Sequence, residues 1–481
     1  MDRREFLAAS GALVVSVSLP RFVSEASAQA GSAPGLPLPD ELDSWVALRP
    51  DGRVSVFFGK MDMGQGLDVA VAQIVAEELD VSVERIDVVM GDTASSCNQG
   101  GGSNSSGIWT GAKPLRNAAA EARRILVDRA AVQLGVPTER LTVSDGVVSV
   151  VDDSTQRITY VDVLGGDAFN TKVTWNQQLG NTLDVKGQAT PKDPSAYKVV
   201  GTSVPRRDVA GKVFGTSDFV TEISLPGMLH ARVIRPPRAA STVVSVDEGS
   251  IRSIPGARVV RDKGFLAVVA PREWDAVRAA QMLRVSWSKT SEPFPPMDKI
   301  YDHIRAASTI KREEPVKKGD VDEAFKNAVR VVQAEYEWPF QSHASMGPAC
   351  AVADVKADEA TIWTGSQKPH AARDGVAKLL GLPPEKVRGI WVMGPGSYGR
   401  NDAGDAAIDA ALLSKLTGKP VRVQGMRRDG TAWDPKGPAS VHRGRAAFDA
   451  SGKVIGYDFL CRGFSRVDIL FNEADPRHRK S

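Results

Sequence analysis

Residues 387–420 read VRGIWVMGPGSYGRNDAGDAAIDAALLSKLTGKP, and no other stretch is as informative about the fold. Its first seven residues, 387–393, are apolar and rich in β-branched side chains, which predicts a buried strand. A glycine-rich turn follows at residues 394–399, and an apolar helical stripe then runs to a stop at Gly418 and Pro420. Because glycines let backbone N–H groups approach an oxyanion and a helix N-terminus adds partial positive charge, this strand, turn and helix predict a cradle for an anionic group.

The turn also spells G-x-G-x-x-G with Gly394, Gly396 and Gly399, the fingerprint of dinucleotide-binding folds. A nicotinamide site needs, in addition, an acidic residue at the end of the next strand to hold a ribose. The next expected strand, residues 421–423, is followed by an acid only at Asp429. The sequence therefore disfavours a nicotinamide site, while a purely structural turn remains an alternative to the cradle.

The N-terminus has the features of an export signal. Arg3 and Arg4 precede a mildly apolar run over residues 8–20, and a small-x-small cleavage pattern follows near Ala28. The run is too short and too rich in Ser, Gly and Ala to cross a bilayer, so we expect no transmembrane span. Residues 1–30 are thus predicted to be a twin-arginine signal that directs a folded, cofactor-containing protein to the periplasm.

Composition excludes some classes of function. The 61 basic and 58 acidic side chains leave a net charge of only +3, which gives no reason to expect a nucleic-acid partner or a membrane surface. The three cysteines, Cys97, Cys350 and Cys461, lie far apart and form no C-x-x-C pair. We therefore expect no metal site built from the side chains of this chain, and any iron–sulfur centre would lie on another chain.

A second strand, turn and helix unit lies near the N-terminus. A strand pair over residues 45–59 leads through Lys-Met-Asp-Met-Gly-Gln-Gly, residues 60–66, into a helix predicted from Leu67 to Leu79. A further strand, residues 86–90, precedes a Gly/Ser-rich run over residues 98–107 and a long helix from Pro114 to Leu134. Such a run can be either a flexible linker or a binding loop, and the sequence leaves both open.

Several motifs together carry a resemblance to a known family. They are K-V-F-G at residues 212–215, L-P-G-M-L-H-A-R-V-I-R-P-P at 225–237, P-F-Q-S-H-A-S-M-G-P at 339–348, M-G-Q-G at 63–66 and, more loosely, the glycine-rich turn at 394–399. Nearly the whole chain after the signal resembles the molybdopterin-binding large subunit of molybdenum hydroxylases, the xanthine dehydrogenase and aldehyde oxidoreductase family. The similarity is to its exported branch of isoquinoline, nicotinate and aldehyde dehydrogenases.

This resemblance implies an α+β (mixed α/β) fold in which parts of a molybdopterin-binding domain flank a small α/β hammerhead domain. The domain boundaries that we predict are a signal peptide at 1–30, an N-terminal molybdopterin-binding segment at 31–145, a linker region at 146–200, the hammerhead at 201–290, a linker at 291–325, and a first molybdopterin-binding domain at 326–481 that is incomplete at its C-terminal end.

The resemblance also implies a molybdenum–molybdopterin cofactor in its cytosine dinucleotide form, whose pyrophosphate and oxo groups need N–H donors. On this view the loop at 100–107 closes over the phosphates and Gln341 reaches the oxo face of the metal. The residues expected to bind the cofactor are Gln65, Gly66, Gln341, Gly396, Ser397, Tyr398 and Gly399.

The implied reaction is hydroxylation of an N-heteroaromatic compound or oxidation of an aldehyde, with water as the oxygen source. Electrons would pass to a small [2Fe-2S] iron–sulfur subunit and a periplasmic cytochrome c. The family takes its base from a Glu in a Gly-Glu motif, yet no Gly-Glu dipeptide occurs in these 481 residues. The catalytic residue is therefore unknown, and we expect a truncated chain or half of a split subunit. The alternative is a catalytically inactive fragment.

Overall fold

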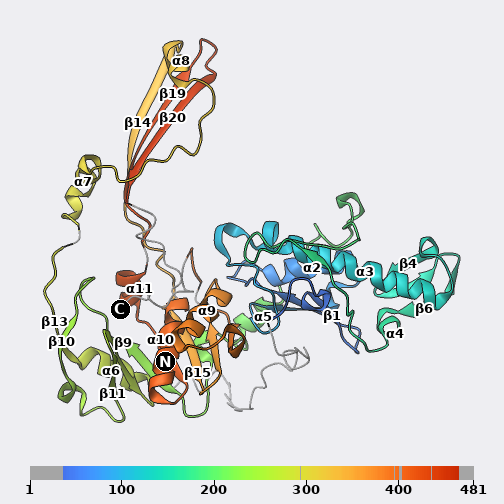
Figure 1. Ribbon diagram of the computed structural model, residues 1–481, viewed down its shortest axis with the longest axis horizontal. Helices are drawn as coiled ribbons and strands as arrows, with labels where there is room; N and C mark the ends of the chain where they lie inside the picture. The colour runs from blue at the N-terminus through green and yellow to red at the C-terminus, as the bar shows by residue number, and fades with distance from the viewer. Residues whose placement is uncertain (1–35, 293, 395, 400–402, 435, 465–481) are drawn as a thin grey trace, which may run out of the picture.

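A computed structural model describes residues 36–464, apart from residues 293, 395, 400–402 and 435 (Figure 1). The predicted export signal at residues 1–30 lies outside the described residues. The described part contains helices and several separate sheets, both parallel and antiparallel, so the predicted mixed α/β class is confirmed. None of the described helices has both the length and the apolar character needed to cross a bilayer.

The N-terminal part is a small sheet covered by two helices. Strands β1 (Val46–Leu48) and β2 (Val54–Phe58) are antiparallel, and β3 (Ile86–Met90) pairs with β2 in parallel. A parallel pair needs a crossover, which α2 (Leu67–Leu79) supplies. Side chains of α2 and of the long α3 (Lys113–Leu134) pack on these strands in one hydrophobic cluster, and every residue of β2 is buried.

The region predicted as a linker, residues 146–200, is packed onto this N-terminal part. An antiparallel sheet of β4 (Leu141–Ser144), β5 (Val147–Val150) and β6 (Asp153–Thr159) is followed by α4 (Tyr160–Leu164), β7 (Thr174–Trp175) and β8 (Val185–Lys186). Tyr160, Phe169 and Val185 belong to the same hydrophobic cluster as α2 and α3. The chain beyond β8 is polar, and buried carboxylates hold its backbone in place. Glu121, for example, accepts from the amides of Gln188 and Ala189.

The central element is a seven-stranded sheet in the order β11-β12-β9-β18-β15-β16-β17. Strands β9 (Leu229–Val233), β11 (Arg258–Asp262) and β12 (Phe265–Ala270) come from the predicted hammerhead, whereas β15 (Cys350–Val355), β16 (Ala360–Thr364), β17 (Val387–Trp391) and β18 (Val421–Gln424) come from the C-terminal part. The two groups meet where β9 and β18 pair in parallel, with Leu229 opposite Val421. One sheet therefore runs through both regions.

Helices cover this sheet. Helix α10 (Ala403–Thr417) packs on β15, β16 and β18 and beside α9 (Pro369–Leu380), while α6 (Glu273–Met282) packs on β9 and β12. The remaining elements of the hammerhead region are α5 (Asp208–Val213) and an antiparallel pair, β10 (Val243–Asp247) with β13 (Arg284–Trp287). A short helix, α11 (Arg427–Trp433), follows β18.

A three-stranded antiparallel arm projects from the rest of the molecule (Figure 1). It consists of β14 (Arg330–Trp338), β19 (Ser440–Phe448) and β20 (Val454–Gly463), with α8 (Val321–Lys326) packed on β20 and α7 (Ile300–Ala306) near the base. The register places Tyr336, Trp338, Tyr457 and Phe459 on one face, where all four side chains are exposed. One face of the arm is therefore aromatic and open to solvent.

Candidate functional site: the junction of the glycine-rich loops

The glycine-rich turn at residues 394–399 lies between β17 and α10, as the sequence predicts. Gly396, Tyr398 and Gly399 adopt positive φ values of 85°, 50° and 124°. Left-handed backbone is easy for glycine and strained for tyrosine. The side chain of Ser397 is buried, and its Oγ accepts a hydrogen bond from the amide of Gly399 at 3.3 Å. The turn is thus tightly wound, with a strained residue at its tip.

The loop at residues 339–348 packs directly on this turn. A Cβ placed on Gly399 would lie 2.5 Å from Cδ2 of His343, so only glycine fits under this imidazole. Ser345 Oγ donates to the carbonyl of Ser397 at 3.4 Å, and Arg427 holds the loop from the other side by donating to the carbonyl of Met346 at 3.2 Å. The structure therefore brings two of the predicted binding loops together.

Gln341 stands at one end of the 339–348 loop, where the arm begins. Its backbone pairs with that of Gly437, with the Gln341 amide donating at 3.0 Å and the Gly437 amide at 2.8 Å. The Gln341 side chain is exposed. The backbone of Gln341 is fixed, while its side chain is free to reach a bound group.

A third segment, residues 364–368, joins this site and was not among the predicted residues. A Cβ on Gly365 would lie 2.9 Å from the Cα of Gly394, and the carbonyl of Thr364 accepts from Val392 N at 3.0 Å. The carbonyl of Gln367 accepts from the amide of Gly102 at 2.9 Å. The turns that follow β16 and β17 meet at one edge of the sheet because these strands pair in parallel, and the sequence alone does not record this pairing.

The Gly/Ser-rich run at 98–107 is a folded loop with its own anchors. Lys60 is fully buried, and its Nζ donates to the carbonyl of Gly101 (2.9 Å), to Oγ of Ser106 (3.2 Å) and to Oδ1 of Asn181 (2.6 Å). Gln99 accepts from the amide of Gly59 at 2.6 Å and donates to the carbonyl of Gly111 at 2.7 Å. These anchors argue against a flexible linker, while a role as a binding loop stays a prediction.

The junction of these loops carries positive charge and unpaired polar atoms. Gly101 lies against Lys368 as well as Lys60, and burial lowers the pKa of Lys60 to about 8. Within the described part of the chain, Nδ1 of His343, both ring nitrogens of His370 and Nε1 of Trp391 are buried without a hydrogen-bond partner. Buried polar atoms are normally paired, but such atoms also occur elsewhere, as at His230 and Arg232, and of the residues named here His343 is the one that contacts the 394–399 turn, through Gly399.

His370 lies in the first turn of helix α9 and is almost completely buried. Its burial, reinforced by the nearby charge of Arg373, lowers its pKa to about 3. The ring is therefore neutral at physiological pH, with one nitrogen carrying a proton and the other a lone pair. It can give or accept a hydrogen bond without adding charge.

Gln65 and Gly66 lie in a different setting from the other predicted residues. The carboxylate of Asp62 accepts from the amides of Gly64 (2.7 Å), Gln65 (2.8 Å), Gly66 (3.3 Å) and Leu67 (3.0 Å). Asp62 thus occupies the N-terminal amides of α2 that an anion would otherwise take. Gly66 is buried in left-handed backbone beside Arg206, and the Gln65 side chain is exposed. Oε1 of Gln65 accepts from the amide of Met63 at 2.8 Å, so its Nε2 group is what Gln65 can offer a ligand.

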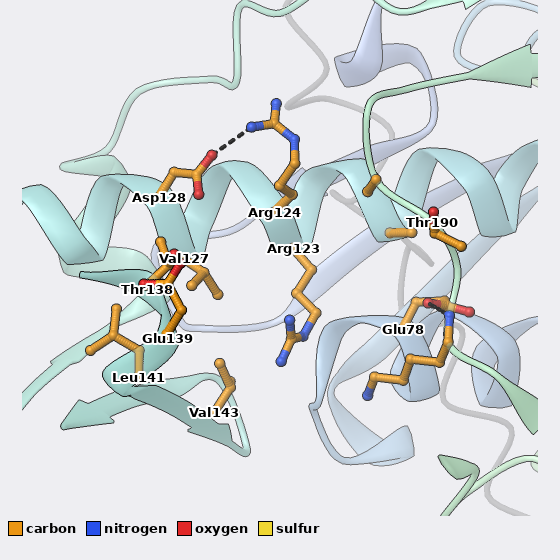
Figure 2. Close-up of a pocket in the computed structure, with 13 residues that line it drawn as sticks. Glu78, Arg123, Arg124, Val127, Asp128, Thr138, Glu139, Leu141, Val143 and Thr190 are labelled. Atoms are coloured by element: carbon orange, nitrogen blue, oxygen red, sulfur yellow. Dashed lines mark hydrogen bonds and ion pairs between the residues drawn. The ribbon is translucent and has the colours of Figure 1, made fainter. Parts of the chain in front are cut away.

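A cavity of about 370 Å³ lies elsewhere, between α3, β4 and residues 189–192 (Figure 2). Its basic side chains, Arg123, Arg124 and Lys192, already have carboxylate partners. Arg123 Nε and Lys192 Nζ both bind Asp80, at 2.6 and 2.5 Å, and Arg124 binds Asp128 at 2.5 Å. A hollow whose charges are satisfied internally has little to offer an anionic cofactor, so the junction of the loops is the stronger candidate.

The cysteines do not form a metal site. Burial raises the pKa of Cys97 and of Cys350 to about 12, so both remain thiols at physiological pH, while Cys461 is exposed on the arm. In the stretches that the structure covers, no group of three or more His, Cys, Asp or Glu side chains is placed to hold a metal ion.

Two regions of the chain match known protein families. Residues 21–206 and residues 303–463 each match a family described as a molybdopterin cofactor-binding domain. The first match contains the loops at 60–66 and 98–107, and the second contains the loops at 339–348, 364–368 and 394–399. The two matched regions therefore meet at the junction described above.

Curated relatives are named as dehydrogenases and oxidoreductases. The B subunit of nicotinate dehydrogenase from Pseudomonas putida is 39% identical over 428 residues, which is 87% of this chain and 35% of that protein. The beta subunit of isoquinoline 1-oxidoreductase from Brevundimonas diminuta is 28% identical over 523 residues, covering 99% of this chain and 67% of that protein. The chain thus spans about one third to two thirds of the length of these two relatives.

Solved structures show a distant likeness. Quinoline 2-oxidoreductase from Pseudomonas putida 86 superimposes with a TM-score of 0.46 at 20% identity, over 55% of this chain and 39% of that one. Aldehyde oxidoreductase from Desulfovibrio gigas gives a TM-score of 0.46 at 18% identity, over 54% of this chain and 34% of that one.

Proposed function

Because the chain belongs to the molybdenum hydroxylase family, with the two molybdopterin-binding matches of its large subunit, we propose that it is the cofactor-binding part of an oxidoreductase. The reaction is hydroxylation of an N-heteroaromatic compound or oxidation of an aldehyde, with water as the oxygen source. The observation that carries this proposal is the junction of loops 98–107, 364–368 and 394–399, which brings wound glycine backbone together with Lys368 and places His343, with its unpaired Nδ1, against Gly399. The names of nicotinate dehydrogenase and isoquinoline 1-oxidoreductase support the first of these substrate classes.

The residues present fit a pterin cofactor that carries phosphate. Gly396, Ser397 and Tyr398 bring three consecutive backbone amides into a tight turn, the arrangement that binds anions in many phosphate sites, while the amide of Gly399 donates to Oγ of Ser397. Gln341 offers a side-chain amide from the neighbouring loop, and Gln65 offers another from the N-terminal part. When bound, the molybdenum–pterin group supplies two-electron redox chemistry at the metal. The cytosine dinucleotide form is part of this proposal.

The chain's own residues shape and shield the site. His343 caps Gly399 and keeps solvent from that side of the turn, and Arg427 fixes the carbonyl of Met346 so that the 339–348 loop stays in place. The neutral ring of His370 provides a hydrogen-bonding partner without altering the charge. Tyr398 is two-thirds exposed at the tip of the turn, so we assign its hydroxyl to the side from which a substrate enters.

We further propose that the protein is exported to the periplasm through the twin-arginine pattern at residues 1–30. It passes electrons to a small [2Fe-2S] subunit and then to a cytochrome c. The wide spacing of Cys97, Cys350 and Cys461, which form no C-x-x-C pair, supports a separate iron–sulfur chain. The two relatives described above are each named as one subunit of an enzyme, which also supports an assembly of several chains.

A second candidate follows from one observation: the sequence contains no Gly-Glu dipeptide, the motif in which the family carries its base. The chain on its own would then hold or dock a cofactor without turning substrate over, as an inactive fragment or as one half of a split subunit. A carboxylate supplied by another polypeptide would complete the second arrangement.

The test is a molybdenum and pterin assay on the purified chain, produced alone and together with a small iron–sulfur subunit. We expect one molybdenum per chain and release of a cytosine nucleotide on hydrolysis. Metal with turnover of an N-heterocycle or aldehyde supports the first candidate, and metal without turnover supports the second. Absence of molybdenum under every pairing would overturn the cofactor-binding function itself.

A further inference from the structure

Lys60 is an unusual residue because its ammonium group is buried without a counter-charge. Its side chain has an exposed fraction of 0%, and its three donated bonds all end on neutral oxygens. No carboxylate of a described residue forms an ion pair with it. Lysine is almost never fully buried unless it is paired, since removing an isolated charge from water costs several kcal/mol. Such a residue is retained only where its bonds matter to the structure or to the function.

Those three bonds connect segments that are distant in the sequence. Lys60 follows β2 and begins the 60–66 loop, Gly101 and Ser106 lie in the glycine-rich loop, and Asn181 lies between β7 and β8. The same segments touch at a second point, where a Cβ on Gly100 would lie 2.6 Å from Oδ1 of Asn181. One side chain therefore joins three stretches of backbone.

The stem of Lys60 requires a glycine at position 111. A Cβ on Gly111 would lie 2.5 Å from Cδ of Lys60, and Gly111 belongs to the π-helical segment 107–112 that leads into α3. On the far side of the loop, Gly101 lies against Lys368. The 98–107 loop therefore contacts Lys60 through Gly101 and Ser106, and it contacts the 364–368 segment through Gly101 and Lys368.

We propose that Lys60 is the positioning residue of the 98–107 loop: its buried ammonium ties this loop to residue 181 and so fixes the surface that the loop turns toward the junction. It acts through the loop and does not itself touch a bound group. The structural part of this inference stands on the contacts alone. Its relevance to cofactor binding rests on the function proposed above.

The charged groups on the elements packed around Lys60 are engaged elsewhere. Asp62 is taken up by the amides of residues 64–67, and Lys113 pairs with Asp184 at 2.9 Å. Lys368, on the other side of Gly101, is a second cation. Lys60 therefore gains no electrostatic compensation from within this part of the protein, and the hydrogen bonds alone hold its charge.

The test is hydrogen exchange, followed by mass spectrometry at pH 7 on the purified chain without cofactor. In Lys60→Met we expect amide exchange to rise at least about tenfold in residues 98–107 and, together with it, in residues 176–183. Lys415→Met, which removes an exposed lysine of α10 outside these segments, is the control and should leave both segments unchanged.

Two results would overturn the proposal. One is unchanged exchange in residues 98–107 of Lys60→Met. The other is an equal rise throughout α2 and α3, which would mean that Lys60 merely stabilises the N-terminal part. If Lys60→Met does not fold, Asn181→Ala removes a single acceptor and should loosen both segments, and a loop that stays protected in this variant would equally contradict the inference. Because no cofactor is present, failure here is distinguishable from failure of the proposed function.

Discussion

The carboxylate of Asp92 accepts two hydrogen bonds from the guanidinium of Arg388, at 3.1 Å from Nε and 2.5 Å from Nη2, across 296 positions of sequence. Beside this pair, the amide of Thr93 donates to the carbonyl of Gly389 at 2.9 Å, and the hydroxyl of Thr93 accepts from the amide of Gly389 at 2.8 Å. The turn after β3 is thereby fixed to the edge strand β17. This contact sets the position of the N-terminal loops relative to the 394–399 turn.

Replacing Arg388 by Met should destabilise the protein by about 2–3 kcal/mol, because it leaves a buried carboxylate without its partner. The value is at the low end for a buried pair since about a third of the Arg388 side chain is exposed. The midpoint of urea unfolding measures the effect. Arg85→Met is the control: its pair with Asp145 is about half exposed and should contribute at most about 1 kcal/mol. Equal shifts in the two variants would contradict the prediction.

Glu77 predicts a pH dependence of stability. Its Oε2 accepts from the amides of residues 198–200 at 2.9, 2.6 and 3.0 Å. Burial alone would raise its pKa, but these donors outweigh burial and lower it. Because the pKa of Glu77 is lower in the folded state, its ionised carboxylate stabilises the fold at pH values above the pKa of the unfolded state, about 4.5. This stabilisation is lost as the pH falls through the pKa of the folded state.

Glu77→Gln should accordingly lose about 1–3 kcal/mol at pH 7 and show a shallower loss of stability on acidification than wild type. Urea midpoints between pH 7 and pH 4 measure both effects. The exposed Glu139 provides a matched control as Glu139→Gln, which should follow the wild-type curve. A Glu77→Gln curve parallel to wild type would show that the amide contacts do not depend on the charge.

The lowered pKa of Lys60 leads to a prediction for the stability of the fold at alkaline pH. Burial lowers its pKa from 10.5 to about 8, so the folded chain releases this proton before the unfolded chain does. Since the unfolded state then binds more protons, the contribution of Lys60 to stability rises from about pH 8 to 10.5, by about 3 kcal/mol at most. Relative to Lys60→Met, wild type should gain in thermal midpoint between pH 7.5 and 9.5. In Lys113→Met the thermal midpoint should change with pH as it does in wild type. The same change of thermal midpoint with pH in all three proteins would contradict the prediction.

Local patterns predicted much of the fold. Helix α2 begins and ends at Leu67 and Leu79 as expected, because left-handed residues at Gly66 and Asp80 bound an apolar helical segment. The strand predicted at 86–90 is β3. The strand, turn and helix around residues 387–417 also form as predicted. In each case the signal lies within the segment itself.

Contacts between distant residues were not predictable in this way. Residues 186–200 are polar and have the composition of a linker, yet the buried carboxylates of Glu77 and Glu121 hold them by their backbone amides. Lys60 looks like any surface lysine until Asn181 is brought beside it. Residues 364–368 acquire their place only from the parallel pairing of β16 with β17. A single sequence records each partner but not the pairing.

Gly399→Ala tests the cradle itself. At φ 124° an alanine is strained by about 1–3 kcal/mol, and its Cβ would collide with the imidazole of His343. The turn must shift, so we expect molybdenum per chain to fall at least about tenfold while circular dichroism shows an intact fold. Gly381→Ala is the matched control, because Gly381 also has positive φ, 73°, but open space around it. The Gly381→Ala protein should lose a little stability and keep its molybdenum. A folded Gly399→Ala protein with full molybdenum would show that this turn does not hold the cofactor.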